Sequence, residues 1–317
     1  MNILYLLRSF KNSILRVKEI VLVARCFYKD YVYYIKTSYK YNTKSKDALA
    51  TPIMLTMHQL EKGISMKKSP RTFGGDKTVR LIQLLNEYKY KYGIDNIYIL
   101  ATNILYEYRK DQWHDISIEN MLDSFLEKNK KILKDGYAGV KNVTIPDSFN
   151  EEEIINFFKT RHSCRDYSEI VVTKYEIEQA ENFAKVTPTA CNRQANRVHF
   201  FNDKEIIKSL IDNQLGAQGW CNNATGLIVI TSNQTFFGGT YERYEALIDG
   251  GLYAMNFVWG LHLQRIGTCF KMFVREPDRE KRFKEIAGIP HSEIPVVLIL
   301  CGHYKNCSVS EPKSVRI

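Results

Sequence analysis

The sequence lacks the short patterns that mark the commonest catalytic and metal sites. It contains no Cys-x-x-Cys, no His-Glu-x-x-His, no Gly-x-Ser-x-Gly and no Gly-x-x-x-x-Gly-Lys-[Ser/Thr]. Zinc sites of the usual spacing, α/β-hydrolase nucleophiles and P-loops are therefore not expected. The seven cysteines are odd in number and scattered, which favours reduced thiols, several of them buried, in a cytoplasmic protein.

Long uncharged apolar runs are also missing. Residues 1–7 are apolar, but Arg8, Lys11, Arg16 and Lys18 soon interrupt the stretch. A secretory peptide would carry its positive charge before the apolar run, and a membrane-spanning helix needs roughly 20 apolar residues. We therefore expect neither.

Proline and glycine are scarce, at 8 and 17 residues, whereas 44% of the chain is hydrophobic and 25% is charged. These proportions exclude collagen-like, linker-dominated and wholly disordered chains. A length of 317 residues suggests about two globular domains.

Positive charge is concentrated at the N-terminus. The net charge is +10, yet residues 151–317 hold 20 basic and 20 acidic side chains. Residues 1–46 alone hold ten basic and two acidic side chains, and residues 47–150 add only +2. A globally basic surface is not needed to explain the total, so we expect no nucleic-acid partner.

Residues 1–46 are predicted to form a basic amphipathic helical arm. Apolar residues recur at three- and four-residue steps from Ile3 to Ala24, beside a partly separate basic stripe that ends at Arg25. Such a helix fits peripheral contact with an anionic membrane. Docking on its own protein or on a dimer partner explains the pattern equally well.

The remaining chain divides into a helical region, 47–150, and a mixed region, 151–317. The first shows helical patterns at 79–92, 97–108 and 116–133, interruptions at Pro52 and Gly63, and a connection marked by Gly136, Gly139 and Pro146. The second alternates between predicted helices (151–160, 174–186, 204–218, 242–264 and 275–287) and predicted strands (198–201, 226–231, 267–270 and 294–301). This is an α+β pattern with four strands, in which the apolar helix 242–264 is expected to be buried.

Irregular segments of the second half carry groups suited to a phosphorylated, planar ligand. Residues 161–165, Arg-His-Ser-Cys-Arg, offer two guanidinium groups and a hydroxyl, which suit a phosphate. Residues 188–194, Pro-Thr-Ala-Cys-Asn-Arg-Gln, combine small residues with two amides for the edge of a heterocycle. Asp249-Gly250-Gly251 lies inside a helix, where each glycine costs about 1 kcal/mol relative to alanine. Close helix packing or a flat ligand against the backbone would explain why glycine stands there. Taken alone, each of the other two segments is equally well explained as an ordinary solvated turn.

In order and spacing, these segments resemble the nitroreductase-like FMN flavoprotein family. The resemblance covers residues 151–317 and also includes 267–270, 286–290, 295–304 and 312–314. It implies an antiparallel sheet flanked by helices. It also implies a homodimer that binds FMN at its interface and exchanges C-terminal extensions between subunits.

The resemblance assigns cofactor-binding residues by position. The phosphate, ribityl chain or ring edge of FMN would be held by Arg161, Ser163 and Arg165. The isoalloxazine would be lined by Pro188, Thr189, Ala190 and Asn192, and the phosphate reached by Lys313 and Arg316. Gln214 or Gln218 would contact the flavin. The implied activity is an FMN-dependent oxidoreductase that passes hydride from NAD(P)H through flavin N5, with no side chain assigned a catalytic role.

Two features depart from the minimal pattern. Lys271-Met272-Phe273 stands where many relatives have a glycine whose backbone faces N5. A non-catalytic flavin-fold protein working with membrane-associated polysaccharide machinery is therefore the alternative. Residues 57–65 resemble the H-x-L-E-K-G-L-S segment of a subgroup found among surface-polysaccharide proteins. That resemblance suggests an acceptor in polysaccharide metabolism. His58 and Glu61 are three residues apart and can therefore share a helix face, as substrate contacts or as packing and capping residues.

Overall fold

The second half of the chain is built around an antiparallel sheet. The computed structural model describes residues 3–66, 72–215 and 223–305. Within these residues, β1 (Asn196–Phe201), β2 (Gly226–Asn233), β3 (Ile266–Met272) and β4 (Glu293–His303) form one sheet in the order β1-β2-β4-β3. All three pairings are antiparallel. The four expected strands and the α+β class are confirmed.

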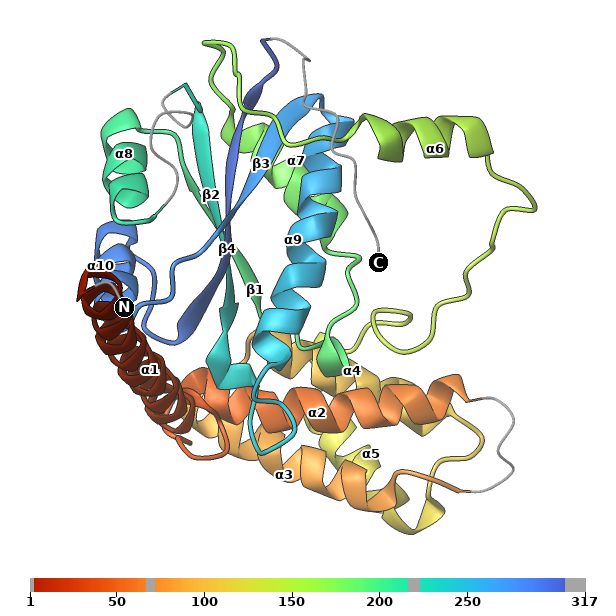
Figure 1. Ribbon diagram of the computed structural model, residues 1–317. Coiled ribbons are helices and arrows are strands. Elements are labelled where there is room, and N and C mark those ends of the chain that lie inside the picture. Colours follow the sequence, from red (N-terminus) through yellow and green to blue (C-terminus); the bar gives the residue numbers. More distant parts are fainter. Residues whose placement is uncertain (1–2, 67–71, 216–222, 306–317) are drawn as a thin grey trace.

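Helices cover both faces of the sheet (Figure 1). One face carries α7 (Lys174–Ala184) and α9 (Glu245–Leu263), and the other carries α8 (Lys204–Asp212) and α10 (Pro277–Ala287). Because side chains alternate along a strand, Ile228 and Ile230 of β2 pack under α7 and α9. Leu227 and Val229 pack under α8 and α10.

The helical region packs below the sheet (Figure 1). It comprises α2 (Lys46–Ser65), α3 (Gly75–Tyr92), α4 (Asn96–Lys110) and α5 (Glu119–Lys128). Its core also takes in side chains of the second half, namely Ala195, Phe236, Phe237 and Ala246. The two regions therefore share one core, and the boundary at residue 150 stays a prediction. Residues 133–150 connect it to α6 (Glu151–Thr160) along the outside of the molecule.

Several sequence expectations were wrong in detail. Pro52 does not interrupt a helix, because α2 runs through it and buries both Thr51 and Ile53 beside it. The expected helix 116–133 is α5 flanked by two short 3-10 turns, 116–118 and 130–132. The helix from Lys204 ends at Asp212 instead of Gln218. The apolar helix α9 is not wholly buried, since Ile248, Leu252 and Leu263 are each at least 50% exposed.

The N-terminal arm is α1 (Ile3–Thr37), which is shorter than the expected 1–46. Its C-terminal part lies against α10 at the edge of the molecule (Figure 1). Within the described residues, no helix is long and apolar enough to cross a membrane.

Candidate functional site

The first predicted cofactor segment is a turn held against the start of β3. Ser163 forms an isolated parallel bridge with Thr268. Burial raises the pKa of the neighbouring Cys269 thiol, and Arg165, a hydrogen bond with Ser163 and Arg161 act in the opposite direction. Arg161, Ser163 and Arg165 therefore all lie near Cys269, and their role in binding a cofactor stays a prediction.

This turn has donor groups that fit an anion. Arg161 is partly buried, and no hydrogen bond or ion pair joins its guanidinium to a described residue. The adjacent His262 has its pKa lowered, first by burial and also by Arg161 and His162. The neutral imidazole adds no further charge, so the anion-binding capacity of the turn comes from its arginines. Two guanidiniums and a hydroxyl are donors that suit a phosphate or the polar edge of FMN.

The second predicted segment is a strained loop between α7 and β1. Cys191, Asn192 and Gln194 have φ values of 53°, 53° and 49°. Each costs about 1 kcal/mol or more in a residue other than glycine. The loop is fixed by the Asp249 carboxylate, which accepts the backbone N–H of Ala190 at 3.0 and 3.2 Å. The amides expected to face a heterocycle bond to each other, with Gln194 Nε2 donating to Asn192 Oδ1 at 2.8 Å.

Arg193 anchors this loop, a role that the sequence analysis missed. The side chain is only 1% exposed, and it donates to both carboxylate oxygens of Glu242 at 2.9 and 3.0 Å. It also donates to the carbonyls of Ala190 and Phe236 at 2.8 and 2.7 Å, and it lies over the Phe237 ring. The partner is 49 residues away in the sequence, so no local pattern announces the pair.

The two glycines after Asp249 have different surroundings. A Cβ added to Gly250 would lie 2.4 Å from Val296 Cγ2 on β4, whereas one added to Gly251 would meet nothing within 4 Å. Close helix packing therefore explains Gly250. Gly251 lies on the exposed side of α9 and leaves room there for a ligand or a partner.

The two halves of the predicted site are far apart within one chain. The first lies by the C-terminal end of α9, where His262 contacts the Phe157 carbonyl of α6. The second lies by its N-terminal half, where Asp249 holds Ala190. Thirteen residues of α-helix separate Asp249 from His262, a distance of about 20 Å. The structure brings together the residues within each segment but not the two segments.

Other predicted positions have structural contacts or lie outside the described residues. Gln214 is buried, and its Oε1 accepts the backbone N–H of Val274 at 2.7 Å. Lys271 is also buried, and its Nζ donates to the carbonyl of Leu215, so this side chain ties β3 to the end of α8. The positions outside the described residues are Gln218, Lys313 and Arg316.

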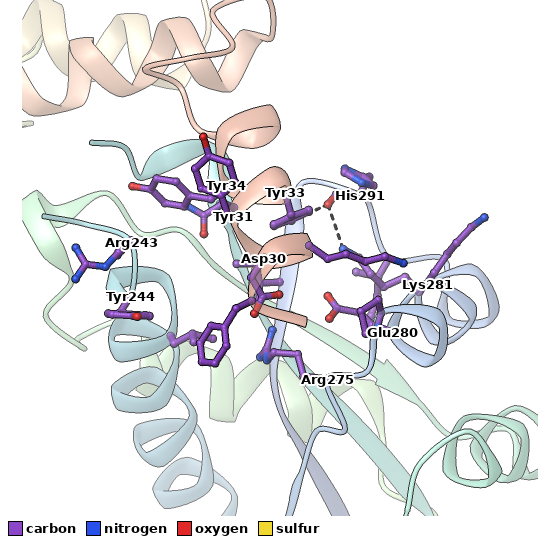
Figure 2. Close-up of a pocket in the computed structure, with 18 of the residues that line it drawn as sticks. Asp30, Tyr31, Tyr33, Tyr34, Arg243, Tyr244, Arg275, Glu280, Lys281 and His291 are labelled. Atoms are coloured by element: carbon purple, nitrogen blue, oxygen red, sulfur yellow. Dashed lines mark hydrogen bonds between the residues drawn. The ribbon is translucent and has the colours of Figure 1, made fainter. Parts of the chain in front are cut away.

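A cavity of about 910 Å³ lies elsewhere, between α1, α10 and the start of α9 (Figure 2). Its size is within the range of small-molecule sites. Aromatic side chains of α1, including Phe27, Tyr31 and Tyr34, form one wall, and Glu280 and Arg275 face them. None of the described cofactor residues predicted from the sequence lines it. The sequence analysis did not predict this cavity.

Comparisons with known proteins point to one family for about half of the chain. No protein-family model matches. The chain is 23% identical over 155 residues to the Archaeoglobus fulgidus protein named "Putative NADH dehydrogenase/NAD(P)H nitroreductase", which covers 49% of this chain and 87% of that protein.

Two solved structures show a weaker likeness. One is an FMN-dependent nitroreductase from Clostridium difficile, with 19% identity, a TM-score of 0.41, and coverage of 51% of this chain and 91% of that one. The other is a nitroreductase family protein from Streptococcus pneumoniae, with 18% identity, a TM-score of 0.45, and coverage of 52% and 95%. The curated relative supports the nitroreductase-like resemblance.

Proposed function

We propose that the protein is an FMN-dependent oxidoreductase that takes hydride from NAD(P)H and acts as a homodimer. The observation that carries this proposal is the turn at 161–165, where Arg161, Ser163 and Arg165 converge beside β3. These residues would hold the phosphate or ring edge, and residues 188–192 would line the isoalloxazine. When bound, FMN supplies hydride transfer, while the protein binds and orients the reactants. Lys313 and Arg316 belong to the same proposal.

The exposed apolar surface of α9 supports the homodimer. Ile248, Leu252 and Leu263 are 54%, 50% and 56% exposed at helical spacing. Helix α6 buries none of its residues, and its Phe158, 51% exposed, packs against Trp259 of α9. Contiguous apolar surface of this kind marks an interaction site. A two-fold axis across α9 would place residues 188–192 of one copy near residues 161–165 of the other, which removes the separation of about 20 Å.

Lys271 and Met272, which replace the residue and glycine of many relatives, support the alternative, a flavin-fold protein that binds without turnover. The buried Lys271 Nζ donates to the Leu215 carbonyl, and Met272 carries a bulky, exposed side chain at the glycine position. A role with polysaccharide machinery rests on residues 57–65 alone. There His58 Nδ1 lies 3.4 Å from a carboxylate oxygen of Glu61, which confirms that the two share a helix face. Burial raises the pKa of Glu61, and His58 opposes the rise.

An absorbance titration tests the proposal. The purified protein should show flavin absorbance, or acquire it with FMN, and NADH or NADPH should bleach it without oxygen. Replacing both arginines (Arg161→Gln with Arg165→Gln) removes two charged donors, each contributing about 1.5–3 kcal/mol, and should weaken FMN binding at least tenfold. Arg282→Gln, on an exposed part of α10, is the matched control and should bind FMN normally.

Each other outcome has a defined meaning. A protein that binds no FMN refutes the enzyme. Bound FMN that neither nucleotide bleaches supports the non-catalytic alternative. If the Arg282→Gln control lost as much FMN affinity as the double arginine variant, net charge, and not the turn, would govern FMN binding.

A further inference from the structure

The C-terminal part of the arm α1 contacts the rest of the chain. Arg25 and Lys29 pair with Asp278 of α10 at 3.2 and 3.5 Å. The Tyr33 hydroxyl donates to the carbonyl of His291 at 2.7 Å, and Tyr34 similarly reaches the loop before α9. These contacts hold α1 at the edge of the molecule (Figure 1).

The preceding stretch of α1, residues 14–24, lies at the surface. Every residue in it is exposed. Large apolar side chains make up much of this surface: Ile14, Leu15, Val17, Ile20, Val21, Leu22 and Val23 are 42–63% exposed. An isolated helix gains little stability in water, and exposed apolar surface of this extent marks a contact site.

One row of these apolar residues forms a stripe along α1. Val17, Val21, Ala24 and Tyr28 follow one another at steps of four and three residues, so they share a face. At 3.6 residues per turn, Tyr33, whose ring lies under the Lys284 ammonium of α10, is about half a turn around the helix from this stripe, so the stripe faces away from α10. Basic residues flank the stripe on both sides, with Arg16 on one side and Lys18 and Arg25 on the other.

We propose that this stripe lies in the surface of an anionic lipid bilayer, with α1 parallel to the membrane. Charge complementarity selects this partner, because residues 1–46 hold ten basic and only two acidic side chains. Flanking Lys and Arg can reach lipid phosphates while their stems stay in apolar surroundings. A second copy of the arm would bring like charges together, and a nucleic acid would leave the apolar stripe in water.

The cavity lies between the arm and α10, on the other side of α1 from the stripe (Figure 2). Phe27 and Tyr31, which are 66% and 61% exposed, line it from α1. Binding through the stripe would leave α1 between this cavity and the lipid surface. The protein would then be peripheral, held through α1, with its sheet outside the bilayer.

Vesicle flotation of the full-length protein tests the proposal. We compare vesicles of phosphatidylcholine with vesicles containing phosphatidylglycerol at equal total lipid. The wild type should float with the anionic vesicles, and less of it with the neutral ones. Val17→Gln with Val21→Gln removes two exposed side chains from the stripe without touching the core, and should lower the partition coefficient about tenfold. Leu15→Gln with Leu22→Gln is the matched control, because these residues are exposed on the other side of the same helix.

The partition coefficient of the control should lie within about threefold of the wild-type value. The FMN absorbance should be the same in all three proteins. Equal losses in both variants would overturn the assignment to the stripe, as would a wild type that floats with neither vesicle. If, without lipid, the molecular mass of the Val17→Gln, Val21→Gln variant in solution were lower than that of the wild type, a second copy of the chain would cover this face. If duplex DNA bound to the arm and thereby abolished vesicle binding, the arm would instead be a nucleic-acid-binding element, and the proposal would be overturned.

Discussion

The adjacent glycines of α9 allow a sharp test of how closely this helix packs on the sheet. Both lie within a helix, where alanine is favoured over glycine by about 1 kcal/mol. Gly251→Ala should therefore raise the free energy of unfolding by about 1 kcal/mol, because the new methyl group meets nothing within 4 Å.

Gly250→Ala should have the opposite effect. Its Cβ would lie 2.4, 3.1 and 3.2 Å from three atoms of the Val296 side chain. Valine is β-branched, so it has few rotamers with which to move aside. Overpacking of this kind costs about 1–3 kcal/mol, and a contact as short as 2.4 Å places the cost at the upper end. The gain in helix propensity offsets about 1 kcal/mol of this cost, so the free energy of unfolding of Gly250→Ala should fall by about 2 kcal/mol relative to the wild type. It should then lie about 3 kcal/mol below that of Gly251→Ala.

Urea unfolding followed by circular dichroism measures both variants and the Gly250→Ala, Val296→Ala double variant. The double variant should recover part of the loss, because it removes the methyl groups that the new Cβ would meet. Equal stability of the two glycine variants would refute the close approach of α9 to β4. A second readout concerns function: if Gly251 faces FMN or the partner copy, Gly251→Ala should weaken FMN binding although the chain itself becomes more stable.

Two further predictions concern buried charges. Arg193→Met leaves Glu242 without its bidentate partner and frees two carbonyls, so the free energy of unfolding should fall by about 3 kcal/mol; a loss below about 1 kcal/mol would contradict the anchoring role. Burial raises the pKa of Glu280 above its ordinary value of 4.5, against the lowering effects of Arg275 and Lys284. The folded protein then binds this proton more tightly than the unfolded chain, so stability should fall as the pH rises above about 4.5. Glu280→Gln should flatten that fall in urea titrations at several pH values, and an unchanged pH profile would contradict it.

The secondary structure was largely predictable because the dominant signals are local. The strand at 226–231 is an apolar run that matches β2, and the helix at 174–186 matches α7 to within two residues. The failures are non-local. Pro52 loses a backbone hydrogen bond within α2, yet the helix continues because the residues around it fill a shared core. No periodicity within α2 could reveal that packing.

The sequence located the two candidate segments, the turn at 161–165 and the loop at 188–194, but it did not reveal their long-range partners. Whether these segments bind a cofactor stays a prediction. The partner of Arg193, Glu242, comes from a distant loop, and only the folded chain shows that this arginine is structural. The cavity was missed for the same reason, because residues that line it together, such as Tyr33 and Glu280, are separated by almost 250 residues in the sequence.

The separation of the two cofactor segments was, by contrast, implicit in the sequence. The predicted helix 174–186 lies between them, and thirteen helical residues span about 20 Å. Two segments joined by a straight helix and short turns lie near its opposite ends. In the structure α7 runs antiparallel to α9, with the side chain of Gln264 donating to the Glu176 carbonyl at one end and that of Asn256 donating to Thr187 Oγ1 nearer the other. A single FMN held by both segments therefore requires two chains, and the apolar surface on α9 lies where the second chain would pack.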